Sequence, residues 1–186
     1  MQGIRPPVAG RFLGCRIKNE RDDGKDQRSL GRGHDRIAPG RNRNSVGLLS
    51  SQDTREVRRQ LQAMVNPVKL VHFTQEFNLE YGRETRMLLQ EVAALSVKLS
   101  LDVHDYLLDQ DQVAAYKVNK VPATVIRNAK DYGIRFYGLP GGYEFVNLLD
   151  AVLAVSQGDS GVSDSSREKL KTLSQPIHLE VFVTPT

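Results

Sequence analysis

The sequence predicts an α/β protein whose mixed central sheet is flanked by helices, and three observations lead to that prediction. Helical and strand-like patterns alternate from residue 50 onward in the order helix, strand, helix, strand, helix, strand, strand, helix. A strand–helix–strand unit followed by a hairpin and a closing helix builds a sheet with both parallel and antiparallel pairs. The 186 residues are 39% hydrophobic and 26% charged, as in a globular domain, and no apolar run reaches the length of about 18 residues that a membrane-spanning helix needs.

The net basic charge of the chain belongs to its first 45 residues. They contain 11 Lys and Arg against 5 Asp and Glu, whereas residues 46–186 contain 15 against 17. The apolar residues of this segment follow neither the helical nor the strand period, so the segment has no face that would join a core. We therefore predict a disordered basic tail over residues 1–45. A start site assigned too far upstream is a second interpretation of the same segment.

Other interpretations of this tail are weaker. A secretory signal would need an apolar region after the basic residues, and none is present. A transit peptide would be poor in acidic residues, which the five acidic side chains contradict. An arm that binds nucleic acid through non-specific phosphate contacts stays open as a less favoured alternative. We expect a cytoplasmic protein in which Cys15 is an incidental thiol.

Residues 46–158 contain the elements of the predicted domain. The first helix starts after Ser50, a helix-capping residue, and carries Val57, Leu61 and Met64 on one face. A helix over residues 83–99 has an apolar stripe at steps of three and four residues. The other predicted elements are strands at 68–73 and 101–106, a helix at 109–118, a hairpin of strands at 121–126 and 134–138, and a long helix that opens after residues 140–142.

Residues 159–186 follow this domain and begin with a polar linker. A short helix is predicted over residues 167–173, and an apolar strand is predicted over residues 177–183. An apolar strand without a neighbour is an open sheet edge. We therefore expect self-association through residues 177–183, unless the strand folds back onto its own sheet.

Four motifs connect the chain with a known family. They are VNPVKL at 65–70, VPAT at 121–124, DYGIRFYGLPGGYEF at 131–145 and VFVTPT at 181–186. In this order they resemble the thioredoxin/glutaredoxin fold, and more narrowly the N-terminal unit of the tandem protein disulfide oxidoreductases. The N-terminal region of the flavoprotein subunit of alkyl hydroperoxide reductase is similar too, with two paired thioredoxin-like units of which the first lacks cysteines. The resemblance implies a thioredoxin-like domain over 46–158, followed by the first helix and strand of an incomplete second unit.

The chain departs from the family at the redox motif. The resemblance places a Cys-X-X-Cys motif between the first strand and the following helix, where this chain has Leu79, Glu80, Tyr81 and Gly82. Thiol–disulfide exchange needs a thiolate and a second, resolving thiol, and these residues supply neither. We therefore expect a thioredoxin-like unit that is non-catalytic in this chain and acts in structure or in substrate docking. The alternative is that the chain is part of an active thiol–disulfide oxidoreductase whose Cys-X-X-Cys half is missing.

Two further features are candidate binding positions. The resemblance implies that Pro122 is a cis-proline facing the redox site, so that Val121 and Tyr81 belong to a docking surface for an extended peptide. The other interpretation is a proline that only starts an edge strand. Gly141 and Gly142 precede a helix and are candidates to hold an anion or a thiol ligand at its N-terminus, or they form a plain turn.

We expect neither a cofactor nor a metal ion. A single cysteine excludes a thiolate-rich zinc site, and the four histidines show no ligand spacing. His72 and His104 are therefore interpreted as ordinary half-buried strand residues. The expected partners are a protein thiol or disulfide substrate, or a second thioredoxin-like unit.

Overall fold

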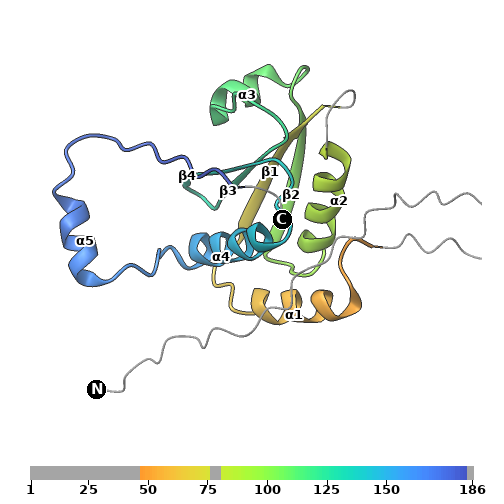
Figure 1. Cartoon of the computed structure of the whole chain (residues 1–186), viewed down its shortest axis with the longest axis horizontal. Coiled ribbons are helices and arrows are strands. Elements are labelled where there is room, and N and C mark those ends of the chain that lie inside the picture. The colour runs from red at the N-terminus through yellow and green to blue at the C-terminus, as the bar shows by residue number, and fades with distance from the viewer. Residues whose placement is uncertain (1–46, 76–80, 184–186) are drawn as a thin grey trace, which may run out of the picture.

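The computed structural model describes residues 47–75 and 81–183, so the predicted tail over residues 1–45 lies outside the described residues. Four strands form one sheet in the order β2-β1-β3-β4 (Figure 1). Their bounds are Val68–Thr74 for β1, Leu99–Asp105 for β2, Ala123–Arg127 for β3 and Asp131–Tyr137 for β4. β1 and β2 are parallel, whereas β3 is antiparallel to both β1 and β4. The predicted mixed sheet is therefore confirmed.

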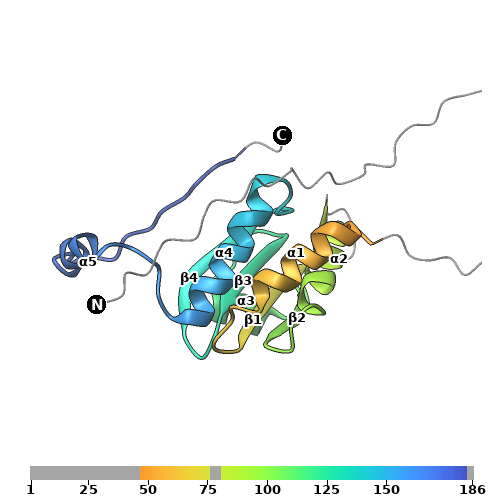
Figure 2. The same cartoon turned by 90° about the horizontal axis from the view of Figure 1, so that it is seen from below.

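Helices cover both faces of this sheet. α1, α2 and α4 bury their apolar sides against one face, and α3 packs against the other. The helices are α1 (Ser51–Leu61), α2 (Gly82–Ala93), α3 (Gln110–Tyr116), α4 (Tyr143–Gln157) and α5 (Asp164–Lys171). Both views show α5 apart from the sheet (Figures 1 and 2). The sheet and the first four helices therefore form a three-layer α/β sandwich.

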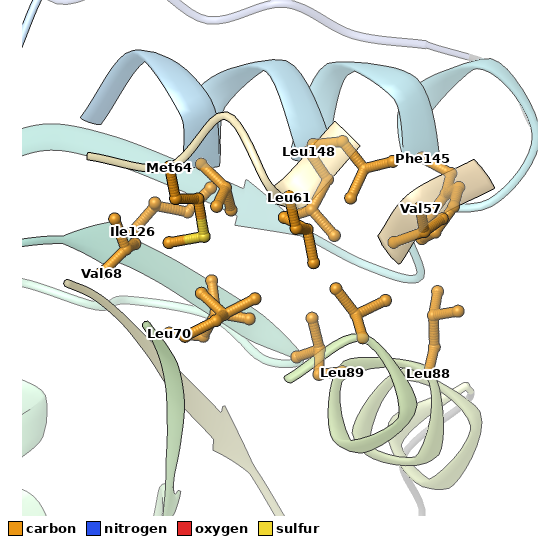
Figure 3. Close-up of a cluster of buried hydrophobic side chains, with 14 of the residues drawn as sticks. Val57, Leu61, Met64, Val68, Leu70, Leu88, Leu89, Ile126, Phe145 and Leu148 are labelled. Carbon is orange, nitrogen blue, oxygen red and sulfur yellow. The ribbon is translucent and has the colours of Figure 1, made fainter. Parts of the chain in front are cut away.

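The alternation of side chains along β1 explains how the two faces are filled. Val68 and Leu70 belong to the core under α1, α2 and α4, whereas Val71 and Phe73 belong to the core on the α3 side. Figure 3 shows the larger cluster, where side chains of three helices meet those of the sheet. Its labelled members are Val57, Leu61, Met64, Val68, Leu70, Leu88, Leu89, Ile126, Phe145 and Leu148. Burying one such side chain contributes about 1.5–3 kcal/mol, so this cluster supplies much of the driving force for folding.

Two polar side chains join helices to distant parts of the chain. The fully buried Ser156 hydroxyl of α4 bonds to the backbone of residues 65 and 66, just before β1. The Glu91 carboxylate of α2 accepts the N–H groups of Leu48 at 2.7 Å and Leu49 at 3.0 Å. These contacts fix both ends of the α1 region against the sandwich.

One predicted helix is wrong in length. The helix expected over residues 83–99 is α2, which ends at Ala93, because Leu99 already belongs to β2. In the connecting turn, the Ser96 hydroxyl accepts the Lys98 N–H at 3.2 Å, and the Lys98 carbonyl accepts the Val68 N–H at 2.8 Å. The apolar stripe thus spans two elements. Smaller boundary errors are a later start of β3, an earlier start of β4 and a shorter α3.

The strand predicted over residues 177–183 is not a strand in the structure. The segment is extended but pairs with no strand in the part of the chain that the structure describes (Figure 1). Its side chains are exposed, with Leu179, Val181 and Phe182 more than four-fifths accessible at 84%, 85% and 83%. The helix expected over residues 167–173 is α5, which buries no residue. An apolar alternation forms a strand only where a neighbour satisfies its backbone, so the incomplete second unit is not confirmed.

Candidate functional site

The start of α2 is the position at which the resemblance places the redox motif. Tyr81 immediately precedes the helix in a left-handed conformation, with φ of 60°. Its carbonyl accepts both the Thr85 N–H at 2.9 Å and the Thr85 hydroxyl at 2.6 Å, which fixes the first turn. Gly82 is buried, whereas the Tyr81 side chain is 48% exposed. Leu79 and Glu80 lie outside the described residues.

Val121 and Pro122 lie at the same end of the sheet. β3 runs antiparallel to β1 with Phe73 opposite Ala123, so Pro122 lies level with Thr74, the last residue of β1, and Val121 extends past the end from which the chain leads to α2. The Val121–Pro122 peptide is cis, as the resemblance implies. The Pro122 carbonyl accepts the Gly138 N–H at 2.9 Å. The structure thus brings the predicted docking residues of two distant segments to one end of the sheet.

The backbone of Val121 has no partner among the described residues. Neither its N–H nor its carbonyl makes a hydrogen bond within residues 47–75 and 81–183. The side chain is half-buried and packs against the core on the α3 side. An extended peptide that adds to a sheet pairs with a backbone N–H and a backbone carbonyl that have no other partner, and Val121 offers one of each.

Lys120 and Tyr137 flank this free backbone. The Lys120 ammonium lies 5.0 Å from the centroid of the Tyr137 ring, within the range of a cation–π contact. Tyr137 is the register partner of Ala123, so the pair stands directly beside the Val121–Pro122 peptide. This end of the sheet therefore presents a positive charge next to the partly exposed ring of Tyr137.

A buried histidine was not recognised from the sequence. His72 is fully buried at 0% exposure, which corrects the expectation of a half-buried residue. Its Nδ1 lies 3.1 Å from the Thr124 hydroxyl, and its Nε2 has no partner within the described residues. Burial lowers the pKa of His72 to about 4, and the Arg86 guanidinium adds to the shift. The ring is uncharged at neutral pH. Its place among Val71 and Phe73 in an apolar strand was the signal for full burial.

Gly141 and Gly142 lie where α4 begins, as expected. Gly142 is the residue before the helix, and its φ of 56° with ψ of −124° is a conformation that only glycine adopts freely. No side chain caps this helix start. Glu144 lies in the first turn, and partial burial raises the pKa of its carboxyl group. A carboxylate in that turn disfavours a second anion, and the backbone conformation accounts for Gly142. The anion or thiol site at Gly141 and Gly142 stays a prediction.

The two other histidines of the described residues, His104 and His178, have structural contacts. His104 stacks on Phe73 with ring centroids 5.4 Å apart, and the His178 ring bonds the Glu180 carboxylate at 2.9 Å. Across the described ranges, no three His, Cys, Asp or Glu side chains gather as a metal site would require. No helix found there has the length and apolar character to cross a membrane.

The strand order, a helix α2 that follows β1 and a cis-proline before β3 together define a thioredoxin-like domain. No family model matches the chain. A protein disulfide oxidoreductase from Aeropyrum pernix k1 superposes with a TM-score of 0.60 at 30% sequence identity, over 67% of this chain and 55% of that one. The AhpF component of alkyl hydroperoxide reductase from Staphylococcus aureus is 29% identical over 107 residues, which are 58% of this chain. NADH dehydrogenase of Bacillus subtilis is 28% identical over 105 residues, or 56% of this chain.

The chain is therefore a thioredoxin-like protein related to the protein disulfide oxidoreductases and to the AhpF component of alkyl hydroperoxide reductase. This relation confirms the resemblance drawn from the four sequence motifs. The matched region is only 18% and 19% of the two curated relatives named above, and 55% of the Aeropyrum protein.

Proposed function

We propose that this domain acts without catalysis, as a structural or docking unit that binds an extended segment of a partner protein at Val121. The partner class that we favour is a protein carrying a thiol or disulfide, or a second thioredoxin-like unit. The observation that carries the proposal is the unpaired backbone of Val121 at the end of the sheet where α2 begins. A cytoplasmic location stays a prediction from the sequence.

The geometry around Val121 supports peptide pairing. A free N–H and a free carbonyl of one residue allow two backbone bonds with an added strand, which gives affinity independent of the partner's side chains. Tyr81, 48% exposed, supplies apolar contact area on the neighbouring segment. Lys120 adds a positive charge that favours an acidic residue in the docked peptide.

The chemistry of the chain supports a role without turnover. Its single cysteine, Cys15, cannot form a dithiol with a second thiol of the same chain. Disulfide reduction by a dithiol requires two thiols, one to attack and one to resolve the mixed disulfide. An insulin-reduction assay with dithiothreitol tests this part of the proposal. We expect no rate above the dithiothreitol background, and turnover above it would favour the alternative of an active oxidoreductase.

The docking part is tested by titrating the ¹⁵N-labelled full chain with S-carboxymethylated insulin B chain, an extended polypeptide without free thiols. We expect amide shifts at Tyr81, Gly82 and Val121. The variant Tyr81→Asn keeps a residue that tolerates the left-handed conformation and should weaken binding several-fold. Tyr132→Asn is the matched control, because Tyr132 on β4 is 42% exposed. Shifts confined to the edge strand β2, or equal effects of both variants, would contradict the proposal.

A further inference from the structure

Residues 177–183 have the pattern of a strand but no strand partner. Ile177, Leu179, Val181 and Val183 alternate with His178, Glu180 and Phe182. None of the backbone groups of this segment forms a hydrogen bond within the described residues, and its apolar side chains are exposed. A segment of this kind gains stability as soon as it pairs with a free edge, because pairing satisfies its backbone and covers its apolar side.

The course of the segment brings it back toward the docking end of the domain. From α5, residues 177–183 return toward the first turn of α4, and both views show this (Figures 1 and 2). α4 follows β4, whose last residue, Tyr137, is the register partner of Ala123. The segment therefore returns to the side of the domain where the chain passes from β4 to α4.

Charge complementarity favours one register of the segment at this end of the sheet. The pKa of the Glu180 carboxyl lies below its usual value, chiefly because His178 bonds it, and the Lys120 ammonium adds to the shift. Lys120 precedes Val121 directly, and side chains of adjacent residues in an extended chain point to opposite faces. If Glu180 pairs with Lys120, then Leu179 and Val181 lie on the same face as the Val121 side chain. The Val121 side chain packs on the apolar core on the α3 side, so this face is apolar.

We propose that residues 177–183 are a tethered strand ligand of this domain, which docks on the free backbone of Val121 with Glu180 beside Lys120. The inference rests on the proposed function, because an external peptide would use the same backbone. A tether of this length gives a local concentration in the millimolar range, so the segment competes with any partner that is present at micromolar concentration. A partner must displace residues 177–183 from Val121. Docking is therefore selective for extended peptides that pair with Val121 more strongly than this segment does.

The first test is amide hydrogen exchange of the full chain. We expect the amides of residues 178–182 to exchange about tenfold more slowly than those of a free peptide, because a docked state populated about 10:1 slows exchange by that factor. Glu180→Lys and Lys120→Glu should each remove the protection, and the double variant should restore it. Glu168→Lys is the control, since Glu168 is an exposed carboxylate on α5. Exchange at the free-peptide rate in the unmodified chain would overturn the inference.

The second test uses the external peptide. If the tethered segment occupies the site about 10:1, its release by Glu180→Lys should lower the apparent Kd for S-carboxymethylated insulin B chain by about tenfold. An unchanged Kd would overturn the tethered ligand while leaving the docking function intact. Absence of any peptide binding in both proteins would instead refute the proposed function. If the exchange protection of residues 178–182 rises with protein concentration, the segment docks on a second copy of the chain, and docking within one chain is overturned.

Discussion

Replacing Ser156 by alanine removes one hydroxyl that holds three backbone groups at the junction of α4 and β1. The Ser156 Oγ accepts the N–H groups of Val65 at 2.9 Å and Asn66 at 3.1 Å, and it donates to the Asn66 carbonyl at 2.7 Å. The side chain is fully buried, so water cannot take its place without opening the junction. The variant therefore separates the contribution of this polar contact from that of the apolar core.

The expected loss of stability depends on which hydrogen-bond partners each backbone group keeps in the variant. The Asn66 N–H still has the Ser156 carbonyl at 3.2 Å, and the Asn66 side chain donates to that carbonyl at 2.9 Å. The Val65 N–H and the Asn66 carbonyl lose their partners. A buried group left unsatisfied costs about 1–3 kcal/mol, and because Val65 and Asn66 are both exposed residues, each cost lies near the lower end of that range. We expect Ser156→Ala to lower the free energy of unfolding by about 2 kcal/mol, or Tm by roughly 10 °C for a domain of this size.

Urea unfolding followed by circular dichroism measures this loss. Ser160→Ala is the control, because Ser160 is exposed in the linker after α4. It should change the unfolding free energy by less than about 0.5 kcal/mol. A loss below that value for Ser156→Ala, with an unchanged urea slope, would show that the junction is not held by this hydroxyl.

Two further predictions concern stability. The pKa of His72 is about 4 in the folded protein, against an ordinary value of 6.5. Between these two pH values the unfolded chain binds a proton that the folded protein does not bind, so the free energy of unfolding falls as the pH drops from about 6.5 through 4. The full loss is about 3 kcal/mol. Urea unfolding at pH 7, 5 and 4 should show this loss of stability both in the unmodified chain and in the control variant His178→Gln. NMR of the His72 ring should give the low pKa directly, and a His72 ring that titrates near 6.5 would contradict the prediction. Glu91→Gln should cost about 1–2 kcal/mol, because its carboxylate accepts two N–H groups, while Glu168→Gln on α5 should cost almost nothing by the same measurement.

The sequence predicts the sheet and its helices because their apolar residues follow clear periods. The boundaries near Leu99 and Asp131 were wrong for a physical reason. The stripe that ends in Leu99 continues across a turn, and its helical spacing does not show that the helix ends at Ala93. The strand predicted over residues 177–183 was wrong because an alternating pattern does not show whether a neighbouring strand is present to pair with it.

The candidate site was predicted only in part. The resemblance to the family implied the cis form of Pro122, and a glycine before a helix indicated the turn at Gly142. The structure has both features. The free backbone of Val121 has no such signal, since it depends on where β1 and β3 stop pairing. The full burial of His72 was indicated only indirectly, by the apolar residues Val71 and Phe73 on either side of it in β1.

The Glu91 contact also decides where the molecule can be attached to a surface. Leu48 and Leu49 are bound to Glu91, which lies ten residues along α2 from Tyr81, a distance of about 15 Å along the helix axis. A biotin or fluorophore carried ahead of Leu48 would therefore enter the domain away from Tyr81. Immobilisation through that end leaves the opposite end open to solution, which suits sensor-chip measurements of captured peptides.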